Sequence, residues 1–387
     1  MKKLSKSARK QLINIIVLVL LIGITLTVLL TCNKELNFQA IMDFIKGSNP
    51  WILATSVLCM LMGVVFEGLS LYLISRHLGH KGKVVSAIAY SSADIYYSAI
   101  TPSASGGQPA AAYYMHKDGM NVGTASFTLV FNVVAYTAAF LVLAAIAFII
   151  NPSLYASFDF WPKFFIILGI VIQSLLLAFF IVCMFCHRII LKVGNGCISL
   201  LVKIKLVKKE EKWRKKLADV VETYRSCTHV FKKHKLLFLN ALLLNIGQRV
   251  ARVLIACCVC IAADPSSSFW DVFALQAYLI VGYVSIPLPG GTGAFEFLCI
   301  SMYKTLYSDG AFVLSAMMVV RTVSYYISII ACGAMTLGYH VYLMRRKPVE
   351  VKNAEPVEET QEEEQKPEVE SSPEEEIQPE EENSTEV

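Results

Sequence analysis

The chain has little charge, and that charge is unevenly placed. Asp, Glu, Lys and Arg make up only 17% of the 387 residues, whereas soluble domains carry about 25%. Hydrophobic residues make up 55%, and the mean hydropathy is +0.55. Residues 1–344 hold 30 Lys and Arg against 14 Asp and Glu, whereas residues 345–387 hold 5 Lys and Arg against 16 Glu. We therefore expect a polytopic membrane domain over residues 1–343 and a disordered acidic tail over residues 344–387.

The motifs of soluble catalysis are also missing. The sequence contains no Walker loop, no G-x-S-x-G and no H-E-x-x-H. Its eleven cysteines form no framework, and Cys257, Cys258 and Cys260 do not have the spacing of a zinc site. The sequence thus indicates no catalytic residue, no metal, no cofactor and no nucleic-acid partner. These absences argue against a soluble enzyme domain.

Long apolar runs predict membrane-spanning helices. A bilayer core of about 30 Å needs about 20 apolar residues of helix. The first run follows a basic N-terminus and no A-x-A cleavage site comes after it, so we expect a retained helix rather than a signal peptide. The predicted spans are residues 11–31, 50–74, 123–151, 162–186, 236–262 and 311–343.

Two further apolar stretches, residues 84–117 and 270–308, are broken by Pro and Gly. Basic residues favour the cytosolic side, which places both termini and the loop 187–235, with its 14 Lys and Arg, in the cytosol of a bacterium. Six full spans satisfy this pattern only if each broken stretch returns to the side from which it started. We therefore predict an all-α protein with six spans and two re-entrant hairpins in inverted arrangement. Eight full spans are the alternative.

The basic loop 187–235 has two interpretations. It contains a short apolar run beside clustered Lys and Arg, so it could lie on anionic headgroups. Ordinary positive-inside charge explains the same residues.

The breaks resemble each other. The first tip, residues 101–109, reads TPSASGGQP, and the second tip, residues 287–296, reads PLPGGTGAFE. Pro ends a helix, Gly frees the backbone, and the next helix begins with unpaired N–H groups that favour an anion. Paired broken helices point to a substrate site near the bilayer midplane; surface loops are the alternative. The candidate residues are Pro102, Ser103, Ser105, Gly106, Gly107, Gln108, Pro289, Gly290, Gly291, Gly293 and Glu296.

Three arginines fall inside predicted spans. Arg249 and Arg252 share a helix face with Asn245 and Gln248, and Arg321 lies ten residues into the last span. A charge at this depth costs at least about 2.5–3.5 kcal/mol, so it should face protein or water. One hypothesis is that the arginines receive a lipid phosphate while Glu296 faces a cationic headgroup. The alternative is internal pairing, for example between Arg321 and Glu296.

With these motifs, the chain resembles the transmembrane, flippase-like region of lysylphosphatidylglycerol synthases of the Gram-positive type. The tips 101–109 and 287–296, Tyr113-Tyr114 and Arg321 carry the resemblance, which covers residues 1–343. Many members of the family have Glu where this chain has Gln108, so the resemblance does not transfer a charged role to that position. It implies lipid handling. The Glu/Pro-rich tail stands where full-length synthases carry a soluble aminoacyl-transfer domain, so we do not expect lysine transfer by this chain alone.

Two functions from different classes follow. The first is translocation of an aminoacylated phospholipid, such as lysylphosphatidylglycerol, or of a glycolipid across the cytoplasmic membrane, which would affect envelope charge and resistance to cationic antimicrobial peptides. The second is the family's own label, phosphatidylglycerol lysyltransferase, or a membrane subunit of a lipid-modifying enzyme. The expected partners are the membrane lipid and a separate lipid-modifying synthase. A weaker hypothesis is a scaffold whose acidic tail recruits a basic partner.

Overall fold

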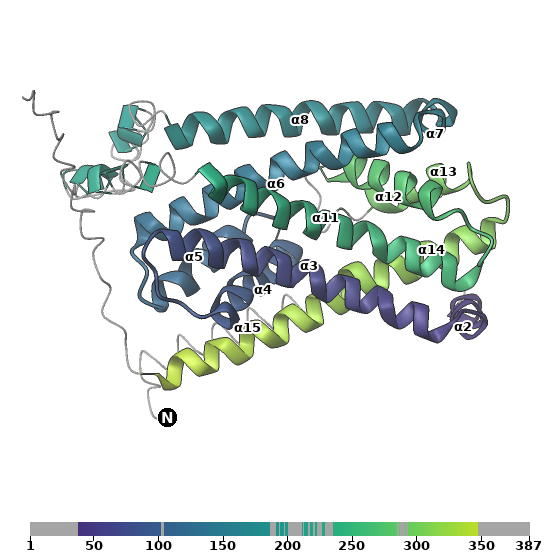
Figure 1. Cartoon of the computed structure of the whole chain (residues 1–387), viewed down its shortest axis with the longest axis horizontal. Coiled ribbons are helices and arrows are strands. Elements are labelled where there is room, and N and C mark those ends of the chain that lie inside the picture. Colours follow the sequence, from purple (N-terminus) through teal and green to yellow (C-terminus); the bar gives the residue numbers. More distant parts are fainter. Residues whose placement is uncertain are drawn as a thin grey trace, which may run out of the picture. The chain divides into compact units, whose positions relative to one another are not determined.

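The computed structural model contains only helices among the residues that it describes (Figure 1). The predicted span 11–31, most of the basic loop and the acidic tail lie outside these residues. The described residues are 38–101, 104–185, 191–192, 194–196, 198–199, 211, 213–215, 217–219, 221–222, 227–228, 235–284, 286, 291 and 293–346.

Five apolar helices in this part of the chain are long enough to cross a membrane. They begin and end within three residues of the predicted spans. Their sequences lack interior Pro, and Asn49 and Asn121 cap two of them by accepting hydrogen bonds from the first N–H groups. The helices are α3 (Pro50–His77), α6 (Val122–Ile150), α8 (Phe160–Phe185), α11 (Lys235–Ala263) and a long final helix made of α14 (Gly310–Arg321), η3 (Thr322–Ile327) and α15 (Ser328–Arg345).

Each broken stretch folds as two short helices. The first contains α4 (Val84–Ile100) and α5 (Gly107–Lys117), and the second contains α12 (Phe269–Tyr283) and α13 (Ala294–Tyr303). The longest of them, α4, has 17 residues, which is about 25 Å at 1.5 Å per residue and less than a bilayer core of about 30 Å. Two other short helices, α2 (Phe38–Gly47) and α7 (Pro152–Ser157), precede α3 and α8.

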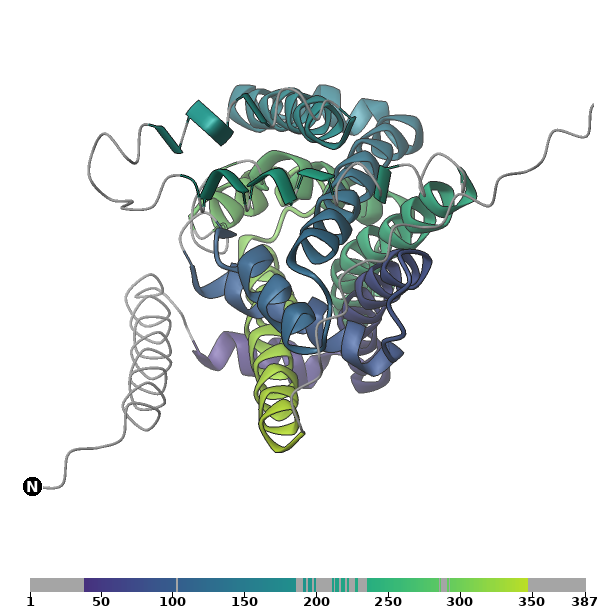
Figure 2. The same cartoon turned by 90° about the vertical axis from the view of Figure 1, so that its left-hand side faces the viewer.

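A buried carboxylate ties the first hairpin to the end of the last helix. Asp118, which follows α5, accepts hydrogen bonds from Tyr90 of α4 at 2.5 Å, from Tyr339 of α15 at 2.8 Å and from Arg346 at 2.7 Å. In the neighbouring loop, burial lowers the pKa of His80 below its usual value although Asp118 opposes the shift. These contacts gather the start of α4, the end of α5 and the end of α15 at one end of the bundle (Figure 2).

The second hairpin begins at the opposite end. Asn151, between α6 and α7, donates to Asp271 of α12 at 2.7 Å, and Tyr307 donates to Ser267 at 2.9 Å. In Figure 1, α4 and α5 lie on the left of the bundle, and α12 and α13 lie on the right.

The helix α11 lies at the centre and packs against α3, α6, α12 and α14. Beside it, α3 and α4 approach closely at Gly68, where a Cβ would come within 2.8 Å of the Ile88 Cα. By contrast, α8 lies at the edge of the bundle and keeps many apolar side chains exposed, as a lipid-facing helix does. The centre of the bundle is therefore where polar side chains are held away from lipid.

Candidate functional site

The polar stripe of α11 faces the interior of the bundle, as the sequence predicts. Asn245, Gln248 and Arg249 are each at most 1% exposed, whereas Arg252 is half-buried. Asn245 donates to Ser70 of α3 at 3.0 Å and to Asn132 of α6 at 3.1 Å. The stripe thus joins three spans through hydrogen bonds.

Arg249 is a buried cation that forms no ion pair with the residues that the structure describes. Its guanidinium lies 3.5 Å from the centre of the Tyr136 ring and 5.2 Å from that of Phe140. Within the described part of the chain, its Nε and Nη2 atoms have no hydrogen-bond partner. Burying an unpaired charge is costly, and rings compensate only part of that cost. Such an arrangement is typical of a site that receives an anion.

Two buried carboxyl groups lie in this part of the bundle, and the sequence interpretation missed both. Glu67 of α3 accepts a hydrogen bond from Gln248 at 2.6 Å, and Asp94 of α4 accepts one from Gln108 at 2.6 Å. The two carboxyl groups also interact with each other, and Arg252 attracts both. Glu67 and Asp94 are the only acidic residues of their helices. That isolation in apolar sequence is the signal that could have found them.

Side chains at the first tip surround Asp94 and donate hydrogen bonds to it. Ser98 also donates to this carboxylate at 3.1 Å, and the N–H of Gly106 donates to the Thr101 hydroxyl at 2.9 Å. A Cβ at Gly107 would collide with Asp94 and Ser98, so only glycine fits there. Gln108 therefore serves as a donor to a carboxylate. The predicted residues Pro102 and Ser103 lie outside the described residues, and Ser105 is exposed.

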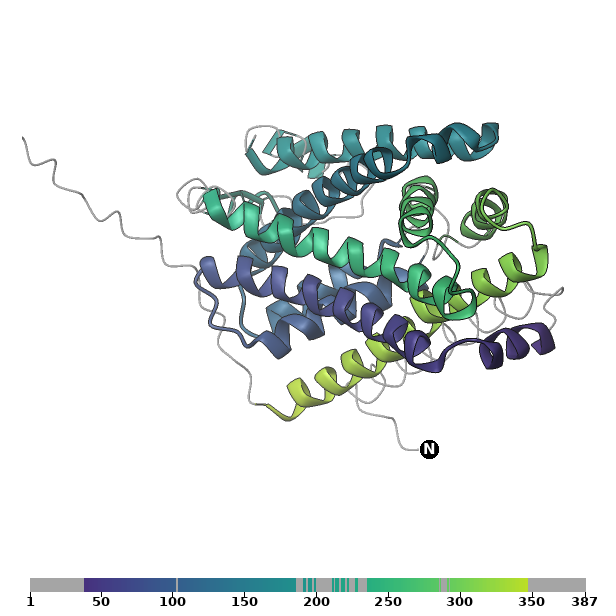
Figure 3. The same ribbon diagram turned by 45° about the vertical axis from the view of Figure 1, so that its right-hand side comes forward.

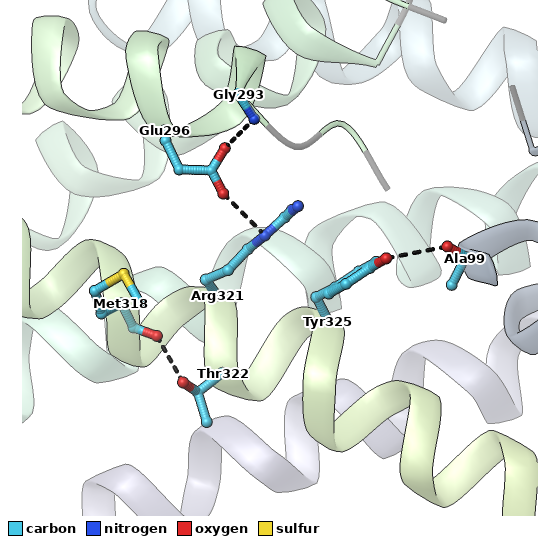
Figure 4. Close-up of polar contacts among 7 residues, drawn as sticks. All are labelled: Ala99, Gly293, Glu296, Met318, Arg321, Thr322 and Tyr325. Atoms are coloured by element: carbon cyan, nitrogen blue, oxygen red, sulfur yellow. Dashed lines mark hydrogen bonds and ion pairs between the residues drawn. The ribbon is translucent and has the colours of Figure 1, made fainter. Parts of the chain in front are cut away.

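The second tip holds its carboxylate by an ion pair (Figure 4). Glu296 accepts a hydrogen bond from the N–H of Gly293 at 2.5 Å, and its other oxygen lies 3.3 Å from Nε of Arg321. Gly291 and Gly293 have φ angles of +67° and +85°, which favour glycine. The internal pair that the sequence offered as an alternative for Arg321 is thus present. The predicted residues Pro289 and Gly290 lie outside the described residues.

The sequence predicts that the helix starts present unpaired N–H groups to an anion, and this stays a prediction. The structure shows bonds for the residues that precede the two helices: the Gly293 N–H binds Glu296, and the Gly106 N–H binds Thr101. Side chains of the protein itself satisfy these donors, because polar backbone groups inside a bundle need partners.

Both tips meet the last helix near its middle. Arg321 ends α14 and also lies 5.0 Å from the ring centre of Phe295 in α13. One turn later, Tyr325 donates to the carbonyl of Ala99, at the end of α4, at 3.0 Å. The intervening element η3 is a π-helix, a distortion often found at functional sites. Figure 3 shows α14 and α15 as consecutive parts of one long helix that passes both hairpins.

An open apolar groove lies outside the second tip. It has a volume of about 480 Å³ and is lined by Trp161 and Phe165 of α8 and by Ile286, Ala294, Phe297 and Leu298. The lining is apolar, so the groove is suited to hydrocarbon. The groove therefore places an apolar surface next to the polar interior.

The comparison with known proteins agrees with this arrangement. The chain matches the family described as lysylphosphatidylglycerol synthase TM region over residues 13–332. That range includes both tips and all three arginines. No match was found among curated proteins. The match over most of the chain shows that it belongs to the family of lysylphosphatidylglycerol synthase transmembrane regions.

Proposed function

We propose that this chain translocates a lipid with an anionic phosphate, such as an aminoacylated phospholipid of the lysylphosphatidylglycerol type, across the bacterial cytoplasmic membrane. The observation that carries the proposal is Arg249, a guanidinium that is 1% exposed and forms no ion pair within the described residues. Family membership supports a role related to lysylphosphatidylglycerol. Translocation would change the charge of the envelope and the resistance to cationic antimicrobial peptides.

Arg249 and Arg252 are the proposed phosphate ligands. A guanidinium donates two parallel hydrogen bonds to a phosphate, and Arg252 makes no hydrogen bond or ion pair to the described residues. Arg321 and Glu296 bind each other, so we assign them to holding the second tip. The groove beside that tip supports a role in receiving acyl chains.

The proposed topology has re-entrant hairpins. In this arrangement α4 with α5 starts and ends at the cytosolic face, α12 with α13 starts and ends at the outer face, and both termini are cytosolic. The short helices and the positions of the two hairpins at opposite ends of the bundle support it. Alternating access between opposed broken helices is a common transporter design.

Sided labelling tests the topology. Lys117 and Ser308 are exposed near the two ends of the bundle. In a cysteine-free background, Lys117→Cys should react with a membrane-impermeant maleimide only from inside the cell. Ser308→Cys should react only from outside. Reaction of both from one side would contradict the inverted hairpins.

A vesicle assay tests the transport. The purified full-length chain should speed the inward movement of fluorescent phosphatidylglycerol and lysylphosphatidylglycerol in liposomes, measured by dithionite quenching. Loss of one charge-assisted contact costs about 1.5–3 kcal/mol, so Arg249→Met and Arg252→Gln should slow this movement about tenfold to a hundredfold. Arg249→Met removes a buried charge and should remain folded.

The matched control is Arg345→Gln, which removes an exposed charge at the end of α15. It should transport as the unchanged protein does. A fluorescent neutral diglucosyl lipid, which has no phosphate, should move at rates that the arginine variants do not change. No acceleration of either phospholipid by the unchanged protein would contradict the proposed function.

A further inference from the structure

Two buried carboxyl groups, Glu67 of α3 and Asp94 of α4, interact at the centre of the bundle. Glu67 is 5% exposed and Asp94 is 8% exposed. They belong to different helices, which Gly68 allows to approach closely, and Ser91 of α4 donates to the Val64 carbonyl of α3 at 3.1 Å. Two carboxylates close together in a site of low dielectric constant repel each other, which favours one proton and one negative charge on the pair.

Polar side chains near this pair carry atoms without a partner in the described part of the chain. Gln248 is completely buried and donates to Glu67, yet its Oε1 has no partner in the described part of the chain. Arg249, whose Nε and Nη2 are also unpartnered there, is attracted by Glu67. Besides its two carboxyl groups, the site thus contains polar atoms that have no hydrogen-bond partner in the described part of the chain.

The surroundings of the pair contain few other ionisable groups. From α11, Arg249 and Arg252 face it, and from α15 the thiol of Cys332 is close to Glu67 and Arg252. Neutral donors complete the surroundings. They are Gln108 from α5, Ser98 from α4 and Gln248 from α11.

We propose that the Glu67–Asp94 pair is the proton site of this transporter, and that one proton binds there together with one phosphodiester anion at Arg249 and Arg252. This inference rests on the proposed function. A hydronium ion would give up a proton, leaving water, and this proton would form a new O–H bond on the ionised carboxylate and make both carboxyl groups neutral. The attraction that holds Arg252 toward the pair is then lost, and its guanidinium can bind the phosphate.

Charge balance favours this linkage. Two arginines and a carboxyl pair with one proton carry one net positive charge. Adding a proton and a monoanionic phosphodiester leaves that charge unchanged. In a site of low dielectric constant, binding an anion without the proton would leave the carboxylate and the phosphate to repel each other. The half-exposed Ser98 and Gln108 at the first tip offer the nearest route for the proton.

Calorimetry can measure how many protons bind with each lipid. Short-chain phosphatidylglycerol is titrated into the full-length protein in detergent, in two buffers with different ionisation enthalpies. The unchanged protein should take up about one proton per lipid, and its affinity should fall about tenfold per pH unit above the titration range. The double variant Glu67→Gln/Asp94→Asn should bind without proton uptake and without this pH dependence. Asp43→Asn, which changes an exposed carboxylate on α2, should behave as the unchanged protein does.

The outcomes separate the two proposals. Lipid binding by the unchanged protein without proton uptake would overturn the proton site alone, and so would unchanged uptake in the double variant. No lipid binding at all would overturn the proposed function. A parallel titration with inorganic phosphate identifies the source of the anion. Equal affinity for inorganic phosphate, with proton uptake, would support the proton site and contradict a lipid ligand.

Discussion

The two tips bind a buried carboxylate with different kinds of partner. Each is a Pro/Gly break that brings a carboxylate of the chain into the polar interior. At the first tip, Asp94 is bound by neutral donors, Gln108 and Ser98. At the second tip, Glu296 is bound by a buried cation, Arg321. An ion pair fixes the charge of its carboxylate, whereas neutral donors and a second carboxyl group allow the charge to change.

The comparison also explains Gln108. A Glu at this position would place a third carboxyl group against Asp94 and Glu67. A carboxamide instead donates to Asp94 and leaves the number of negative charges unchanged. An amide at this position is thus compatible with an acidic first tip, because α4 supplies the acid.

The largest expected effect is at the ion pair of the second tip. Glu296→Gln leaves the buried Arg321 guanidinium facing a neutral amide, which should cost about 3 kcal/mol. Asp94→Asn at the first tip should cost only about 1 kcal/mol, because an amide oxygen still accepts from the same neutral donors. Thermal unfolding in detergent measures both. The double variant Glu296→Gln/Arg321→Met should recover most of the loss, and equal losses at the two tips would contradict the comparison.

The second largest effect is expected at Gly107, which packs against Asp94. A Cβ at Gly107 would collide with the Asp94 side chain and lie 2.6 Å from its carbonyl oxygen. We expect Gly107→Ala to cost about 1–3 kcal/mol by overpacking. The neighbouring Ala110→Gly is a control in which space is added rather than filled, and it should cost only the helix-interior penalty of glycine, roughly 1 kcal/mol. A Gly107→Ala protein that unfolds as the unchanged protein does would show that the first tip is loosely packed.

Substitution of Gly291 and of Gly293 in the second tip should destabilise the protein to different extents. Both need a positive φ, which costs an L-residue about 1–2 kcal/mol. A Cβ at Gly291 would in addition lie 2.7 Å from the Tyr283 ring, whereas one at Gly293 would meet open space. Gly291→Ala should therefore destabilise the protein more than Gly293→Ala. The reverse order in thermal unfolding would mean that contacts at Tyr283 do not shape this tip.

The smallest expected effect concerns the link between the first tip and η3. Tyr325→Phe removes the hydrogen bond to the Ala99 carbonyl and keeps the ring over Arg321, so it should cost about 1 kcal/mol. The matched change Tyr342→Phe alters an exposed tyrosine of α15 and should be neutral. A loss from Tyr325→Phe as large as that from Glu296→Gln would show that the two tips depend on one shared support.

The helices could be read from the sequence because their cause is local. Apolar runs of more than 20 residues fix the spans, and Pro with Gly fixes the breaks, so the ends of α3 and α6 lie within three residues of prediction. The polar stripe of α11 follows from helical periodicity alone. Its inward orientation follows because a buried arginine cannot face hydrocarbon. These features depend on neighbours along the chain.

Only the tertiary structure decided which polar groups meet. Glu67 and Asp94 are single acids in two different helices, and no spacing along the chain relates them to each other or to Gln248. Their contact depends on the close packing of α3 and α4 at Gly68 and on the central position of α11. Likewise, the sequence was compatible with two partners for Arg321, a lipid phosphate or Glu296. Helix packing places the Glu296 carboxylate oxygen 3.3 Å from the Arg321 Nε. A charge inside a membrane protein takes whichever partner the fold places within reach, and that distance is set by helix packing.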